Sequence, residues 1–73
     1  MDKFRALQVF RRVVELNGFS AAARDLDLSN AGVSKTVSAL EAELGAQLLV
    51  RTTRKLRLTD TGQAYYDRAA SSA

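Results

Sequence analysis

Residues 19–44 decide the fold, and they read FSAAARDLDLSNAGVSKTVSALEAEL. Ser20 is a favoured helix N-cap residue. Ala21-Ala22-Ala23 then combines high helix propensity with little bulk, so a second helix can approach closely. This short helix is predicted to end near Leu26. Asp27-Leu28-Ser29 then predicts a tight connection, because Asp tolerates turn conformations and Ser29 can cap the next helix.

The next helix is predicted over residues 30–44, with Gly45 as its C-terminal stop. Its apolar residues recur at helical spacing and share one face: Val33, Val37, Leu40 and Leu44. The opposite face of the first turns is small and polar and has no acidic residue: Ala31, Ser34, Lys35 and Ser38, with Asn30 at its leading end. Glu41 and Glu43 come only in the last turns, and we interpret them as surface charges.

A helix is also predicted before this pair, from a cap at Asp2 to a stop at Asn17-Gly18. Its apolar residues recur at steps of three or four and are expected in the core: Phe4, Leu7, Phe10, Val13 and Val14. Outer residues of this stripe, together with Tyr65 and Tyr66 near the C-terminus, are candidates for a subunit interface.

After Gly45 the pattern changes to short segments rich in Leu, Val and Thr. Residues 47–51 and 56–59 predict a two-stranded hairpin, although residues 52–55 between them lack the usual Asn-Gly turn. Thr59 or Asp60 is expected to cap a last helix. The sequence stops inside that helix without a stop signal, so we expect a piece of a longer chain.

Composition limits the chemistry that this chain can perform. Its 73 residues make one small domain, and 47% hydrophobic with 26% charged residues is typical of a globular protein. The sequence has no cysteine and no histidine, which removes thiolate metal sites and the commonest general base. We therefore expect no catalytic residue, no bound metal and no cofactor.

The apolar runs are too short to span a membrane, and no export signal is visible, so a cytoplasmic location is expected.

The net charge of +3 is unevenly distributed. Residues 1–50 are balanced, whereas residues 51–57 hold four basic residues and no acid: Arg51, Arg54, Lys55 and Arg57. Duplex DNA needs a helix face without bulk or negative charge for its major groove, and cations for its phosphates. The helix over 30–44 and this basic segment meet those two needs. Arg57 alternates with Leu56 and Leu58 and is interpreted as facing water.

The order of elements describes a winged helix-turn-helix, and the sequence closely resembles the N-terminal domain of LysR-type transcriptional regulators. The matching segments run over nearly the whole chain: Phe19–Leu26, Ser29–Lys35, Leu40–Arg54 and Leu58–Gly62. The fold class expected is mainly α, with a three-helix core, a short two-stranded wing and the start of a linker helix. The expected division is a DNA-binding domain over 1–59, with the helix-turn-helix at about 19–45 and the wing at about 47–59, followed by a truncated linker helix over 60–73.

The resemblance implies sequence-specific binding of double-stranded DNA at an inverted-repeat operator. It places Asn30, Ala31, Ser34 and Lys35 where the family's recognition helix meets the major groove, and Arg51, Thr53 and Arg54 on the wing. It also implies a homodimer or higher oligomer formed through the linker helix, and an effector-binding domain that is absent from this chain. From the residues themselves we add Ser20, whose helix N-terminus can bind a phosphate, together with Ser38 and Lys55.

The chain departs from the family pattern at positions that affect which DNA sequence it binds. Asn30-Ala31 stands where the family usually has Gln-Pro or Gln-Ser, Lys35 stands where it usually has Arg, and Leu49 replaces a Phe. Asn can still pair with adenine through two hydrogen bonds, but with a shorter reach, and Lys offers a point charge instead of a planar fork.

Two other classes of function remain as alternatives. A winged helix used only for protein–protein contact is disfavoured by the acid-free helix face and the basic segment. A small hydrolase that uses a serine and a lysine lacks a plausible oxyanion site in so short a chain.

Overall fold

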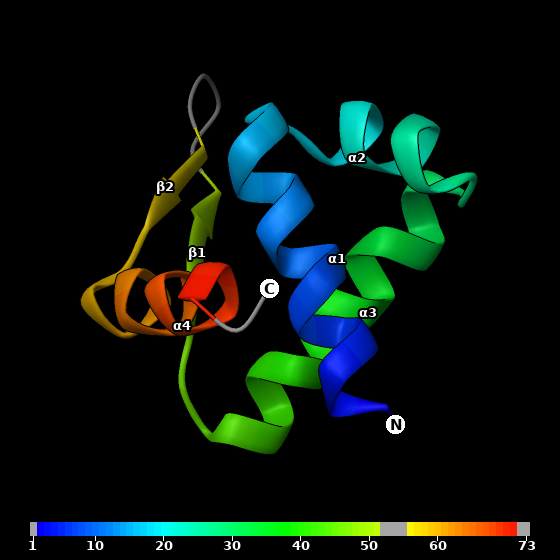
Figure 1. The fold of residues 1–73 in the computed structure, drawn as a ribbon. Coiled ribbons are helices and arrows are strands. Elements are labelled where there is room, and N and C mark those ends of the chain that lie inside the picture. The colour runs from blue at the N-terminus through cyan, green and yellow to red at the C-terminus, as the bar shows by residue number, and fades with distance from the viewer. Residues whose placement is uncertain (1, 52–55, 72–73) are drawn as a thin grey trace.

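The computed structural model describes residues 2–51 and 56–71, and of Arg51 only the backbone. Its elements follow the predicted order (Figure 1): α1 (Lys3–Leu16), α2 (Phe19–Leu26), α3 (Asn30–Leu44), β1 (Leu49–Arg51), β2 (Leu56–Leu58) and α4 (Asp60–Ser71). The mainly helical class and the winged helix-turn-helix architecture are therefore confirmed.

Helix α1 begins and ends as its sequence predicts. The Asp2 carboxylate accepts hydrogen bonds from the backbone N–H groups of Phe4 (3.1 Å) and Arg5 (3.3 Å), which satisfies two donors that the helix itself leaves free. At the other end Asn17 takes the left-handed conformation (φ 54°). Gly18 does not share it, because its φ of 173° is extended backbone.

Helix α1 lies at the centre of the molecule and contacts α2, α3 and α4 (Figure 1). Among the described residues, the core contains eleven buried apolar side chains from α1, α2, α3 and the start of the hairpin: Ala6, Val9, Phe10, Val13, Ala22, Ala23, Val33, Val37, Leu40, Leu48 and Leu49. The predicted apolar face of α3 is confirmed, with Leu44 partly buried at its end. Phe4 is not in the core as predicted, because 62% of its surface is exposed at the first turn of α1.

The two strands pair antiparallel, with Leu49 opposite Leu58 and Val50 opposite Arg57. Both strands are shorter than the predicted 47–51 and 56–59, because the ladder ends at Leu48, whose backbone N–H is bonded outside the sheet. Its carbonyl oxygen accepts the backbone N–H of Thr59 (3.0 Å), and its own N–H donates to a side chain of α3. The hairpin thus begins directly against the end of the three-helix core.

Helix α4 is capped by Thr59, which settles the choice between Thr59 and Asp60. The Thr59 hydroxyl accepts the backbone N–H of Gly62 at 2.9 Å. Gly62 is buried against the hairpin, and a Cβ atom there would lie 2.9 Å from the carbonyl carbon of Leu48 and 3.1 Å from Cδ2 of Leu58. The first turn of α4 can approach the hairpin this closely only because residue 62 has no side chain.

Candidate nucleic-acid interface

The turn between α2 and α3 is built from main-chain bonds and one side-chain cap. Asp27 takes the left-handed conformation (φ 58°), and the N–H of Leu28 donates to the carbonyl of Ala23 at 2.8 Å. Ser29 then caps α3 as predicted, because its hydroxyl accepts the N–H of Gly32 at 2.9 Å. These bonds fix the angle at which the two helices meet.

The N-terminal half of α3 presents the predicted polar face. Asn30, Ala31, Lys35 and Ser38 are exposed, whereas Ser34 is half-buried at the edge of this face. Within the part of the chain that the structure describes, Lys35 forms no ion pair, so its charge is not neutralised by a neighbouring carboxylate. The face is therefore small, polar and cationic.

Ser20 does not cap α2 as predicted. The helix begins two residues earlier than such a cap implies, with Gly18 as an N-cap that makes no side-chain bond, because Phe19 is already helical and packs against the core. The hydroxyl oxygen of Ser20 instead accepts a hydrogen bond from Nδ2 of Asn30 at 3.0 Å. Two predicted site residues from different helices are thereby brought together.

The C-terminal half of α3 has a structural role that the sequence did not reveal. Glu41 is not a free surface charge as predicted, because its Oε2 atom accepts the backbone N–H groups of Leu48 (2.7 Å) and Leu49 (3.1 Å). The carboxylate thus ties the end of α3 to the beginning of the hairpin. No local pattern in the sequence distinguishes Glu41 from the exposed acid Glu43 two positions later.

The basic segment is only partly described. Thr53, Arg54 and Lys55 lie outside the described residues, as does the side chain of Arg51, whose backbone pairs with Leu56. Their expected contacts with DNA therefore stay predictions. Arg57 is exposed in β2, as its alternation with leucines predicts.

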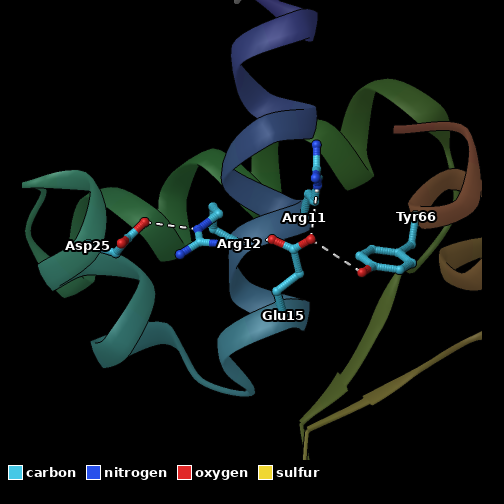
Figure 2. Close-up of polar contacts among 5 residues, drawn as sticks. All are labelled: Arg11, Arg12, Glu15, Asp25 and Tyr66. Carbon is cyan, nitrogen blue, oxygen red and sulfur yellow. Dashed lines mark hydrogen bonds and ion pairs between the residues drawn. The ribbon is translucent and has the colours of Figure 1, made fainter. Parts of the chain in front are cut away.

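A set of ion pairs connects α1 to its neighbours (Figure 2). Arg12 Nε lies 2.8 Å from an Asp25 oxygen of α2, and Arg12 Nη1 lies 2.9 Å from a Glu15 oxygen. Glu15 also accepts from Arg11 Nε (3.0 Å) and, at 3.4 Å, from the Tyr66 hydroxyl of α4. Asp25 thus helps to hold α2 on α1.

These contacts change the acidity of two groups. The hydrogen bond to Asp25, followed by that to Glu15, raises the pKa of the Arg12 guanidinium. The hydrogen bonds from Arg11 and then Arg12 lower the pKa of the Glu15 carboxyl below its ordinary value. The ionised Glu15 thus joins α1 to α4 through Tyr66, whereas Arg12 joins α1 to α2 through Asp25.

A second surface lies beside α4 and contains some of the residues predicted as candidates for a subunit interface, which stays a prediction. A groove between α1 and α4 is lined by Phe4, Leu7 and Tyr65, with Lys3, Arg11 and Arg68 around it. The guanidinium of Arg68 lies 5.9 Å from the centre of the Tyr65 ring. Tyr66 does not line this groove and instead reaches Glu15.

No group of metal-ligating side chains occurs within residues 2–51 and 56–71. No helix in that same part of the chain is both long and apolar enough to cross a membrane.

Comparison with known proteins identifies the family. A model of the bacterial regulatory helix-turn-helix proteins of the lysR family matches residues 4–63. The chain belongs to the LysR family. Among relatives, it is 51% identical over 69 residues to an uncharacterized HTH-type transcriptional regulator of Escherichia coli K12, YhjC, covering 94% of this chain and 23% of YhjC. It is 47% identical over 66 residues to the transcriptional activator AaeR of the same organism, covering 90% and 21%.

Solved structures of LysR-family domains have the same fold. The structure of the BenM DNA-binding domain with catB site 1 DNA superposes with a TM-score of 0.90 at 37% identity, covering 97% of this chain and 78% of that one. The CbnR domain in complex with DNA gives 0.89 at 38% identity, covering 97% and 80%. The chain spans less than a quarter of the length of the curated relatives described above.

Proposed function

We propose that this chain is the sequence-specific DNA-binding domain of a LysR-type transcriptional regulator. Helix α3 enters the major groove with its polar face. Arg51, Arg54 and Lys55 of the basic segment 51–57 bind the flanking phosphates. The observation that carries the proposal is the exposed N-terminal half of α3, where Lys35 has no acidic partner among the described residues. A helix fits the major groove, and only a face without negative charge can approach base edges between two phosphate backbones.

The similar structures support this proposal, since the BenM and CbnR domains are seen in complexes with DNA. The proposed contacts follow the sequence prediction: Ser20, Asn30, Ala31, Ser34, Lys35, Ser38, Arg51, Thr53, Arg54 and Lys55. We also propose the division expected from the sequence, with the DNA-binding domain over 1–59 and the start of a linker helix over 60–73.

The whole regulator is proposed to act as a homodimer or higher oligomer, joined through the helix that α4 begins. Two copies then read an inverted repeat with half-sites about one helical turn apart. An effector would bind a domain outside this chain. Since the target is chromosomal DNA, the proposed location is the cytoplasm.

Titration of duplex DNA at 50 and 200 mM salt tests the proposal. A dimer with 6–10 phosphate contacts is expected to lose on the order of 10³–10⁵ in affinity over that range, because each contact releases counterions. Absence of DNA binding at 50 mM salt would contradict the proposal and favour the protein–protein alternative.

The Lys35→Ala variant tests the orientation of α3. It is expected to weaken binding and to relax the preference at one base step. The matched control is Lys3→Ala, which removes the same charge from the first turn of α1 beside the α4 groove. Equal losses of affinity for Lys35→Ala and Lys3→Ala would show that only total charge matters.

Arg54→Ala is expected to weaken binding about equally on all sequences, as the loss of a phosphate contact does.

A further inference from the structure

The hydrogen bond between Ser20 and Asn30 joins the first turns of the two helices that form the helix-turn-helix. Ser20 is the second residue of α2, and Asn30 is the first residue of α3. Both are exposed, and Nδ2 of Asn30 lies 3.0 Å from the Ser20 oxygen. Because the bond links side chains ten positions apart, it is not a local turn bond and depends on the arrangement of both helices.

In this bond Nδ2 of Asn30 is directed at the Ser20 oxygen. An asparagine amide has a donor nitrogen and an acceptor oxygen, and rotation by half a turn exchanges them. With the nitrogen directed at Ser20, the oxygen must lie on the other side of the amide, away from α2. One N–H of the amide is used by Ser20, and among the described residues neither the second N–H nor the carbonyl oxygen makes a further hydrogen bond, so both can face a base.

The fixed amide matches some bases and not others. In the major groove adenine offers an amino donor beside the N7 acceptor, which an amide can meet with its oxygen and one N–H. Guanine offers two acceptors, O6 and N7, so an amide oxygen directed toward it meets another oxygen. An asparagine that is free to rotate could present its nitrogen to guanine instead, and would discriminate less.

We infer that Ser20 is a positioning residue for sequence readout: it holds the amide of Asn30 so that the domain prefers adenine over guanine at one base step of each half-site. The inference rests on the proposed function and adds to it the base preference and the residue that enforces it. A serine hydroxyl can donate as well as accept, so this bond alone would also allow the rotated amide. When the Ser20 O–H donates to a phosphate, its oxygen acts only as the acceptor, and the amide nitrogen of Asn30 is held toward Ser20. Ser20 then links the backbone contact to the base contact.

The test is selection of bound duplexes from a random pool by the 73-residue chain and its Ser20→Ala, Ser20→Thr and Asn30→Ala variants. The unmodified chain is expected to favour adenine over guanine by roughly tenfold at one position of the half-site. Ser20→Ala should reduce this preference to below about threefold at that position only. Ser20→Thr keeps the hydroxyl and should restore it.

Asn30→Ala identifies the position, because the base step that loses its preference in this variant is the one that Asn30 reads. The double variant Ser20→Ala/Asn30→Ala should match Asn30→Ala in its base preference, since Ser20 acts on readout only through Asn30. The free protein gives a second readout. In NMR spectra of the unbound chain, one side-chain amide proton of Asn30 should exchange with water more slowly than in Ser20→Ala.

The outcomes separate this inference from the proposed function. If the chain selects a sequence but Ser20→Ala leaves the adenine preference intact, the inference is wrong and DNA binding stands. A Ser20→Ala variant that loses affinity equally on every sequence would likewise leave Ser20 with only a phosphate contact. If the unmodified chain selects no sequence at all, sequence-specific binding itself is overturned, and the inference with it.

Discussion

The helix-turn-helix (residues 19–44) and the hairpin are attached to the rest of the molecule in different ways. Helices α2 and α3 bury apolar residues at regular spacing against α1, and each ends in a left-handed residue, Asp27 or Gly45. The hairpin is held at what we term the hairpin junction, a small set of polar and close contacts made by Glu41, Gln47, Leu48, Thr59 and Gly62.

This difference concerns how the two parts of the proposed interface are kept in place. Apolar packing is spread over many side chains, so the loss of one polar contact in α2 leaves most of it intact. The hairpin junction has few members, and several share the same atoms: the Leu48 carbonyl accepts both the N–H and the hydroxyl of Thr59, at 3.0 and 3.3 Å. Single substitutions at the junction should therefore cost more stability than polar substitutions between α1 and α2.

Gly62→Ala should have the largest effect. The added methyl group would overlap the backbone of Leu48, which cannot rotate away as a side chain can. We expect a loss of about 3 kcal/mol or more in the free energy of unfolding, as for other overpacked core sites. Urea denaturation measures it. Gly18→Ala is the matched control, because a Cβ at Gly18 meets nothing within 4 Å; equal losses in both variants would contradict the close approach.

Glu41→Ala should follow, with a loss of about 2 kcal/mol, because it leaves two partly buried backbone N–H groups without their charged acceptor. Glu43→Ala is the control, since Glu43 is exposed two residues further along the same helix. Denaturation should show a loss for the first variant alone. Amide hydrogen exchange at Leu48 and Leu49 should accelerate in that variant, and unchanged exchange would rule out the bond.

Glu15→Gln tests the contacts of α1 with α2 and α4, and its cost should be below about 1 kcal/mol because exposed ion pairs are weak. The pKa of Glu15 is lowered in the folded state below its ordinary 4.5. The contribution of Glu15 to the free energy of unfolding is therefore complete above about pH 4.5. It is lost as the pH falls through the lower folded-state pKa. Thermal melts at pH 7 and pH 3 should differ less in Glu15→Gln than in the unmodified chain. An unchanged difference would show that Glu15 makes no such contribution.

Gly18→Ser should produce the smallest change, a gain of about 0.3 kcal/mol. Gly18 is the N-cap of α2, has extended backbone that any residue adopts, and makes no side-chain cap bond. A serine there can accept a free N–H of the first turn, an improvement of a few tenths over glycine. A melting temperature higher than that of the unmodified chain would confirm the gain in stability. A lower melting temperature would mean that α2 needs the glycine for another reason.

The helix-turn-helix could be predicted from the sequence because its signals are local. Asp2, Ser29 and Gly45 cap the expected helices, and the 3–4 spacing of apolar residues indicates the buried faces. The predicted cap at Ser20 is wrong, because the packing of Phe19, a tertiary contact, moves the start of α2 two residues earlier.

The hairpin junction could not be predicted in the same way. Glu41 and Gly62 act on residues that are seven and fourteen positions away, and neither has a local pattern that distinguishes it from an ordinary surface acid or helix glycine. The bond between Ser20 and Asn30 could not be predicted either, because it joins side chains ten positions apart, although both residues were predicted to belong to the interface.

The contact between α1 and α4 also bears on the order of folding. Tyr66 and Glu15 are 51 positions apart, whereas Arg12 and Asp25 are separated by 13. Closing the longer loop costs about 1 kcal/mol more chain entropy. We therefore expect helices α1 to α3 to assemble first and α4 to dock on α1 last.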